Sequence, residues 1–232
     1  LRVLGGESDI EYRVRHLLEN ANPTAAIYCK TGECEIRITA RAETDSSAEK
    51  MCRAYATKFY DLLGDAVYDE DVTGLEETLV HTLKEKGLTI ATAESCTGGY
   101  LAKRITDVSG SSKVFECGVC SYSNRIKHQL LGVSEQTLAE YGAISEQTAA
   151  EMASGVRNLS GADIGISVTG NAGPTADEGK EVGLVYIGVD SPKLTHVFTL
   201  HVNRRDQDAR ETIRYLASSH ALSLILKAAQ RL

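Results

Sequence analysis

A serine and two glycines follow a stretch that the sequence predicts to be a buried strand. The run Thr92-Ala-Glu-Ser-Cys-Thr-Gly-Gly99 comes directly after the apolar residues 88–91 and directly before residues 100–105, whose apolar positions have helical spacing. Ser95 therefore lies where a strand passes into a helix. The backbone N–H groups at the start of a helix are unpaired and carry a partial positive charge.

A serine hydroxyl beside such donors suits nucleophilic attack on a carbonyl carbon. The backbone N–H groups of Cys96, Thr97 and Gly98 are candidates for holding the oxyanion that develops. Gly98 and Gly99 have no Cβ, so the backbone there can approach a ligand closely. The alternative interpretation is a helix-capping serine followed by a glycine turn.

A nucleophilic serine needs a base, and the best candidate is a lysine. Tyr122 and Lys127 flank a second predicted strand-to-helix junction, so both side chains can face one pocket. Lysine acts as a base when it is held neutral. The alternatives are a tyrosine at the edge of a strand and a solvated helix lysine. No G-x-S-x-G motif is present, and no histidine has a telling context: His16, His81, His128, His196, His201 and His220.

A third loop, residues 169–174, follows another predicted buried strand and begins with Thr169 and Gly170. Ligands of parallel α/β sheets bind at the carboxyl ends of the strands. Ser95, Tyr122 and Thr169 all fall at such ends, which predicts one shared pocket.

Four arginines near the start of the last predicted helix could bind a phosphate or a carboxylate. They could equally form a solvated basic helix face. These residues are Arg204, Arg205, Arg210 and Arg214.

The elements that carry these residues alternate between strands and helices from residue 73 onward. A predicted hairpin, residues 183–189 and 194–202, and a closing helix, residues 208–231, complete the pattern. This order predicts a layered α/β/α domain with a mixed sheet over residues 73–232.

Residues 1–72 predict a separate small α+β domain with the order helix, strand, strand, helix, the last helix opening with a capping box at residues 46–49. Residues 65–71 are expected to be an acidic linker. The order resembles that of KH-type nucleic-acid modules, but no G-x-x-G loop joins the helices. With 9 Lys and Arg against 14 Asp and Glu, residues 1–72 carry a net charge of −5. Because RNA binding needs a basic surface, we do not expect nucleic acid as a partner.

The composition is that of a globular protein, with 232 residues, a net charge of −7 and 42% hydrophobic residues. No apolar run approaches the ~20 residues that span a bilayer, and the first residues do not resemble a signal peptide. The six cysteines include the C-x-x-C pair Cys117 and Cys120, which we interpret as buried strand thiols. We therefore expect a cytoplasmic protein without a metal or another cofactor.

Four runs together resemble one known family, the C-terminal domain of the CinA (competence/damage-inducible) proteins. These runs are residues 92–99, Tyr122-Ser-Asn-Arg-Ile-Lys127, Tyr141-Gly-Ala-Ile-Ser145 and Gly170-Asn-Ala-Gly-Pro174. The resemblance covers residues 73–232, and residues 1–72 resemble the middle domain of full-length CinA. The family's N-terminal molybdopterin-binding-like domain has no counterpart in these 232 residues.

The resemblance implies hydrolysis of the carboxamide of nicotinamide mononucleotide to nicotinate mononucleotide and ammonia. It implies Ser95 as the nucleophile, Lys127 as its base and Tyr122 as a helper in proton transfer, with Thr169 lining the site. An arginine of the family's Gly-Asp-Arg triplet falls at Arg210, although Asp208-Ala209 precede it here. We expect a homodimer. The alternative function is a silent nucleotide-binding module that acts in competence or the DNA-damage response.

Overall fold

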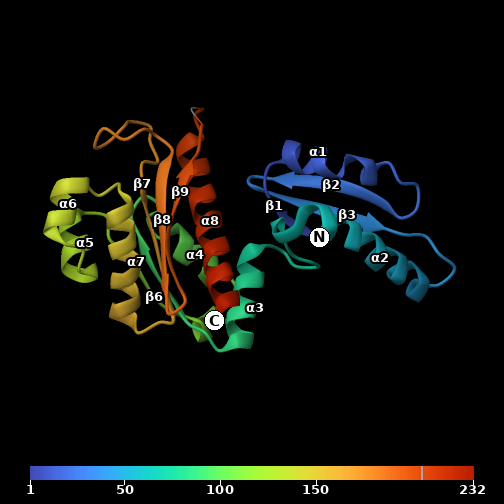
Figure 1. Cartoon of the computed structure of the whole chain (residues 1–232), viewed down its shortest axis with the longest axis horizontal. Helices are drawn as coiled ribbons and strands as arrows, with labels where there is room; N and C mark the ends of the chain where they lie inside the picture. Colours follow the sequence, from blue (N-terminus) through green and yellow to red (C-terminus); the bar gives the residue numbers. More distant parts are fainter. Residues whose placement is uncertain (205) are drawn as a thin grey trace. The chain divides into compact units, whose positions relative to one another are not determined.

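The computed structural model describes residues 1–204 and 206–232, and the chain divides into two compact units, Leu1–Thr78 and Leu79–Leu232 (Figure 1). Arg205, one of the four candidate arginines, lies outside the described residues.

The first unit is a four-stranded antiparallel sheet in the order β2-β3-β1-β4 with two packed helices. Its elements are β1 (Arg2–Leu4), α1 (Glu7–Leu18), β2 (Thr24–Lys30), β3 (Glu33–Thr39), α2 (Asp45–Leu63), a 3₁₀ turn (Gly64–Ala66) and β4 (Val67–Asp69). The alternating residues of β3 and the apolar stripes of both helices form one core that includes Ile10, Ile36 and Phe59.

The sequence pattern of this unit predicts its helices and long strands but misses two short strands. Residues 65–71 are not a linker, since Val67–Asp69 pairs with β1. Strands of three residues are too short to show an alternating pattern. The α2 helix also begins earlier than the predicted capping box, because the Thr44 hydroxyl accepts from the Ser47 N–H at 3.2 Å.

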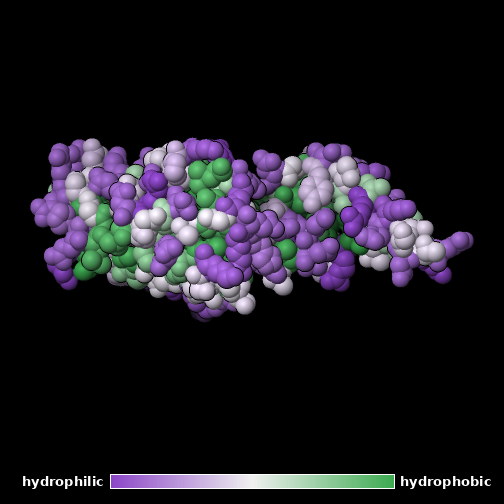
Figure 2. Space-filling model, turned by 90° about the horizontal axis from the view of Figure 1, so that it is seen from below, coloured by the Kyte–Doolittle hydropathy of each residue, from purple (hydrophilic) through white to green (hydrophobic). Residues whose placement is uncertain are grey.

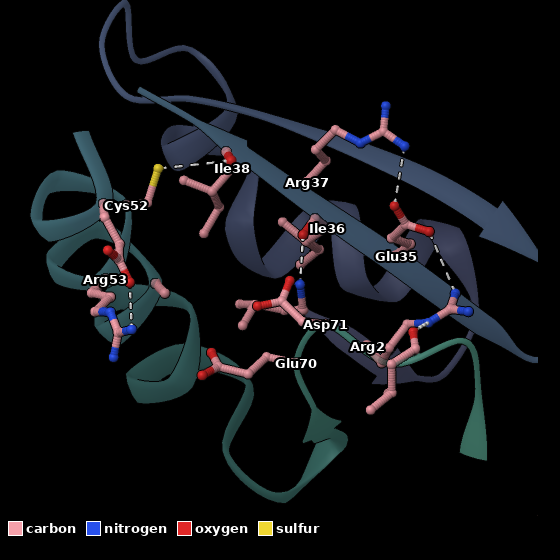
Figure 3. Close-up of a pocket in the computed structure, with 13 residues that line it drawn as sticks. Arg2, Glu35, Ile36, Arg37, Ile38, Cys52, Arg53, Glu70 and Asp71 are labelled. Carbon is pink, nitrogen blue, oxygen red and sulfur yellow. Dashed lines mark hydrogen bonds and ion pairs between the residues drawn. The ribbon is translucent and has the colours of Figure 1, made fainter. Parts of the chain in front are cut away.

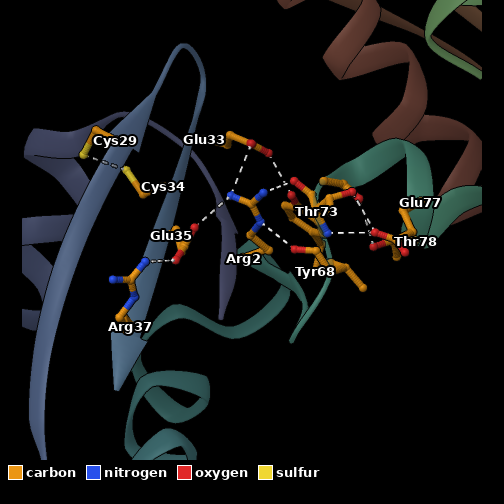
Figure 4. Close-up of polar contacts among 12 residues, drawn as sticks. Arg2, Cys29, Glu33, Cys34, Glu35, Arg37, Tyr68, Thr73, Glu77 and Thr78 are labelled. Atoms are coloured by element: carbon orange, nitrogen blue, oxygen red, sulfur yellow. Dashed lines mark hydrogen bonds and ion pairs between the residues drawn. The ribbon is translucent and has the colours of Figure 1, made fainter. Parts of the chain in front are cut away.

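Arg2 links the sheet to the residues that follow it (Figure 4). It is 5% exposed, and its Nε donates to the Val72 carbonyl at 3.1 Å. Its Nη1 lies 3.7 Å from Glu33 and 3.6 Å from Glu35, and the Tyr68 hydroxyl donates to Glu33 at 2.7 Å. A buried guanidinium is tolerated because carboxylates and carbonyls surround it.

A cavity of about 350 Å³ lies beside β3 and α2 in this unit (Figure 3). Its lining mixes charges, and each of its three arginines pairs with a glutamate: Arg2 with Glu35, Arg37 with Glu35, and Arg53 with Glu49. A charge-balanced lining of this kind differs from the dense basic face that binds phosphodiesters.

The second unit is built on a mixed sheet in the order β6-β5-β7-β8-β9. Strands β6, β5 and β7 are parallel, and β7, β8 and β9 are antiparallel. The strands are β5 (Ile90–Glu94), β6 (Phe115–Cys120), β7 (Ile164–Gly170), β8 (Leu184–Ser191) and β9 (Leu194–His201).

Helices cover both faces of this sheet (Figure 1), which gives the predicted α/β/α layers. Helices α5, α6 and α7 lie on one side, and α4 and α8 on the other. The helices are α3 (Leu75–Lys86), α4 (Tyr100–Thr106), α5 (Asn124–Leu131), α6 (Glu135–Tyr141), α7 (Glu146–Ser160) and α8 (Ala209–Arg231), with a 3₁₀ turn at Ser111–Lys113.

Every residue of β5 and every residue of β7 except Gly170 is buried, whereas β6 is an edge strand in which exposed and half-buried residues alternate. The prediction of buried thiols in β6 is therefore wrong: Cys117 is half-buried and Cys120 is exposed. An apolar run does not distinguish a central strand from an edge strand.

The surface is largely hydrophilic with scattered apolar patches on the face that Figure 2 shows. Among the described residues, no helix combines the length and the hydropathy needed to span a bilayer.

Gly155 lets α7 pack directly on the end of α5, the helix that carries Lys127. A Cβ at this position would lie 1.9 Å from the backbone carbonyl oxygen of Leu131. We expect Gly155→Ala to lower the free energy of unfolding by about 1–3 kcal/mol, because the backbone of α5 would have to move. Urea unfolding measures this, with the exposed Asn158→Ala on the same helix as the control. Equal stability of the two variants would contradict this account of the packing.

Candidate active site

Three parallel strands end at one edge of the second sheet, at Glu94, Cys120 and Gly170. A cavity of about 600 Å³ opens there. Among the residues that line it are most of those singled out in the sequence: Ser95, Cys96, Tyr122, Lys127, Thr169, Gly170 and Arg210.

Lys127 is buried at the base of this cavity, with 1% of its surface exposed. Helix α5 begins after Ser123, whose hydroxyl accepts from the Ile126 N–H at 3.4 Å and so caps the helix. Lys127 lies in the first turn and points back toward the strand ends. Its Nζ lies 3.1 Å from Ser95 Oγ, 3.0 Å from the Ser121 carbonyl oxygen and 3.4 Å from the Tyr122 carbonyl oxygen.

These three oxygens can all accept from a Lys127 ammonium, and they also fit a neutral amine. Two N–H groups of Lys127 can donate to the two carbonyls, which leaves the nitrogen lone pair to accept the proton of the Ser95 hydroxyl. Burial lowers the pKa of Lys127, while the negative charge of Glu178 acts against this shift. The geometry and the pKa both favour Lys127 as a base toward Ser95.

The neighbouring thiol does not compete with this hydroxyl. Burial raises the pKa of Cys96 to about 12, so the thiol is protonated at neutral pH.

The carboxylate of Glu94 holds the loop that carries Ser95 in place, and Glu94 is 1% exposed. It accepts hydrogen bonds from the N–H groups of Gly99 at 3.0 Å, Leu101 at 3.0 Å and Ala102 at 2.8 Å. A carboxylate at this position also complements the dipole of α4. Glu94 thus stabilises the turn between β5 and α4 that presents Ser95.

Backbone hydrogen bonds narrow the predicted oxyanion site. Gly98 N–H donates to the Ser95 carbonyl at 3.1 Å, and Gly99 N–H is bonded to Glu94, so neither faces a substrate. Thr97, Gly98 and Gly99 also lie outside the cavity lining. In the described part of the chain, the N–H groups of Cys96 and Thr97 donate to no carbonyl or side-chain oxygen. Because Cys96 lines the cavity and Thr97 does not, the Cys96 N–H remains as the candidate oxyanion donor.

The glycines serve the turn rather than the ligand, since Gly98 and Gly99 have φ values of +59° and +91°. Arg214 from α8 fixes the same turn from the other side, because its Nη2 donates to the Thr97 carbonyl at 2.6 Å.

Thr169 lines the cavity, but its hydroxyl is already bonded. It donates to the Ala143 carbonyl at 2.7 Å and is 1% exposed. It therefore connects the end of β7 to the segment that precedes α7. Its role in the described structure is to shape the cavity wall.

Arg210 and Tyr122 lie together at the opening of the cavity. Arg210 Nη1 donates to the Gly173 carbonyl, and Nη2 lies 3.5 Å from the Tyr122 hydroxyl. The Tyr122 side chain, expected to help in proton transfer, is 64% exposed, and its hydroxyl lies near Arg210 rather than between Ser95 and Lys127. Only the Tyr122 carbonyl approaches Lys127.

No role was predicted for Glu94 or Glu178, and Arg214 was predicted only as a candidate anion ligand. Glu94 had a visible signal, since a charged residue ends an otherwise uncharged buried strand. Arg214 was one of the four arginines, but nothing in the sequence tied it to Thr97. Glu178 lies far along the chain in a loop without a recognisable pattern. The described residues contain no group of three or more potential metal ligands.

The chain is therefore a two-unit α/β protein: a small α+β unit comes first, and a mixed-sheet unit follows, with a serine and a buried lysine at the carboxyl ends of its parallel strands. The family description "CinA C-terminal domain" matches residues 72–229, and "Damage-inducible protein CinA KH domain" matches residues 1–68. The chain belongs to the CinA family.

Curated relatives include a putative competence-damage inducible protein of Thermoanaerobacter sp. (strain X514), 44% identical over 97% of this chain and 54% of the relative. A CinA-like protein of Kosmotoga olearia is 44% identical over 98% of this chain and 55% of the relative. The chain spans about half the length of the curated relatives it matches.

Two crystal structures resemble the second unit. A CinA superfamily protein from Escherichia coli has a TM-score of 0.63 at 33% identity, covering 66% of this chain and 88% of that one. The competence/damage inducible protein CihA from Agrobacterium tumefaciens has a TM-score of 0.61 at 34% identity, covering 70% and 99%.

Proposed function

We propose that this chain is a serine-dependent amidohydrolase that removes ammonia from the carboxamide of nicotinamide mononucleotide. The observation that supports this most is the 3.1 Å separation of Lys127 Nζ and Ser95 Oγ inside a cavity. The choice of nicotinamide mononucleotide as the substrate rests on the resemblance of the sequence motifs to those of the CinA family. The work of such an enzyme is pyridine nucleotide recycling in the cytoplasm, and we propose a homodimer.

In the proposed reaction, Lys127 takes the Ser95 proton as Oγ attacks the carboxamide carbon. The N–H group of Cys96 stabilises the oxyanion, a contribution of roughly 2.7–4 kcal/mol per donor in other enzymes. The Lys127 ammonium then returns the proton to the departing nitrogen, which leaves as ammonia. Water then attacks the acyl carbon while Lys127 accepts one of its protons. As the bond between that carbon and Ser95 Oγ breaks, Lys127 returns the proton to Oγ, and the carboxylic acid product is released.

A coupled ammonia assay against a panel of amides tests this function. Nicotinamide mononucleotide should be turned over, and simple aliphatic amides should be poor substrates. Binding of the nucleotide without ammonia release would favour the alternative, a silent binding module. Loss of turnover on chelation that added metal restores would exclude a Ser–Lys mechanism.

Arg210 is proposed to hold the substrate phosphate or carbonyl as a charge-assisted donor. Arg210→Ala should lower kcat/KM roughly ten- to hundredfold, the effect of losing one or two charged hydrogen bonds. Arg204 is a matched control, because it is near in sequence, pairs with Asp206 at 3.0 Å and does not line the cavity. Similar small effects of both substitutions would show that Arg210 does not contact the substrate.

A further inference from the structure

Glu178 is one of two acidic residues, with Asp177, that line this cavity and whose charge the proposed mechanism does not use. It lies in the loop between β7 and β8 and lines the cavity that contains Ser95 and Lys127. Its backbone has φ +51°, an uncommon value for a residue with a side chain. The backbone of Glu178 is therefore held in an uncommon conformation, in the wall of the same cavity as Lys127.

A backbone cradle fixes the position of the Glu178 carboxylate. Its Oε1 accepts from Ala143 N–H and its Oε2 from Ile144 N–H, both at 3.0 Å. Gly142 makes room for it, since a Cβ there would lie 2.4 Å from Oε2. This cradle belongs to the Tyr141-Gly-Ala-Ile-Ser145 run, one of the four runs that resemble the CinA family, for which no role was predicted.

The cradle is itself held rigidly by hydroxyl groups. Ser145 and Thr148 donate to the Gly142 carbonyl at 3.0 and 2.7 Å, and Thr169 donates to the Ala143 carbonyl at 2.7 Å. These bonds orient the peptide groups that bind Glu178. The negative charge on this cavity wall is therefore fixed in place rather than carried on a free side chain.

The cavity lining contains four charged residues. Lys127 and Arg210 can carry positive charge, and Asp177 and Glu178 carry negative charge. The field of Glu178 reaches the base, because its carboxylate acts to raise the pKa of Lys127 against the effect of burial. A cation placed in the cavity would be attracted to Glu178 and would favour neutral Lys127.

We propose that Glu178 selects amides whose ring carries a positive charge, such as a pyridinium carboxamide, over neutral amides of the same shape. This proposal deepens the proposed function, on which it rests. It also explains how the product is released: hydrolysis converts the carboxamide of the ring into a carboxylate, and Glu178 repels that negative charge.

The test compares 1-methylnicotinamide, a cation, with neutral nicotinamide, which has the same carboxamide. The wild-type kcat/KM should favour the cation by about tenfold or more, and Glu178→Gln should bring the ratio close to one. Glu181→Gln is the matched control, because Glu181 belongs to the same loop but does not line this cavity. Glu178 is exposed, so its substitution leaves the core intact.

Calorimetric binding of both compounds to Ser95→Ala protein separates this proposal from the proposed function. If wild-type protein releases no ammonia from any amide, the proposed function fails, and the binding preference still tests Glu178. Equal binding and equal turnover of the two compounds by the wild type would overturn the proposal. A cation preference that persists in Glu178→Gln would do the same.

Discussion

Ser95→Ala protein is expected to release ammonia from nicotinamide mononucleotide at least about a thousandfold more slowly than the wild type, as when nucleophiles of other hydrolases are removed. The substitution removes only the Oγ that lies 3.1 Å from Lys127 Nζ. Because the backbone of residue 95 still donates to the Val168 carbonyl at 2.9 Å, the turn should keep its shape. Substrate binding should change little, so the loss should appear in kcat.

A second serine of the same cavity provides the control. The Ser123 hydroxyl caps α5 and has no bond to Lys127. Ser123→Ala should cost about 1 kcal/mol of stability as a lost helix cap, with a rate loss far smaller than that of Ser95→Ala. Mass spectrometry of protein quenched during turnover should detect an acyl group on Ser95 in the wild type and none in Ser95→Ala. Substantial turnover by Ser95→Ala would exclude covalent catalysis at this residue.

Local patterns in the sequence were sufficient to predict the position of Ser95 and Lys127. Strands were predicted to end just before Ser95 and Tyr122, as β5 and β6 do, and Lys127 was predicted to follow the second strand-to-helix junction. Parallel strands place their carboxyl ends at one edge of a sheet, so the shared cavity followed from topology. These signals are local in the sequence, and each corresponds to an element of the folded structure.

The hydrogen-bond partners could not be predicted in the same way. The acceptors around Lys127 are backbone carbonyls of Ser121 and Tyr122, which every residue type possesses. Residue identity therefore suggested a role for the Tyr122 hydroxyl, whereas only its carbonyl approaches the lysine. Likewise, Gly98 and Gly99 indicated ligand contact, but their N–H groups are bonded within the turn. Side-chain types identify candidates, and the path of the backbone decides which atoms meet.

Replacing Lys127 is expected to remove turnover as completely as replacing Ser95, because both act on one proton. Lys127→Ala and the more nearly isosteric Lys127→Met both lack the amine, so Ser95 keeps its proton at neutral pH. In the wild type, kcat/KM should rise with pH through an apparent pKa below the ~10.4 of a free lysine, since burial lowers the pKa of Lys127. Initial rates of ammonia release across a pH series measure this.

The same shift gives a readout that does not depend on catalysis. Because the pKa of Lys127 is lower in the folded protein than in the unfolded chain, the unfolded chain binds more protons between those two pKa values. The contribution of Lys127 to the free energy of unfolding should therefore increase as the pH rises through that window. Urea unfolding at several alkaline pH values should show this increase in the wild type and a smaller one in Lys127→Met. Near-normal turnover by Lys127→Ala would contradict the role of Lys127 as the base. Identical pH dependence of stability in wild type and Lys127→Met would contradict its lowered pKa.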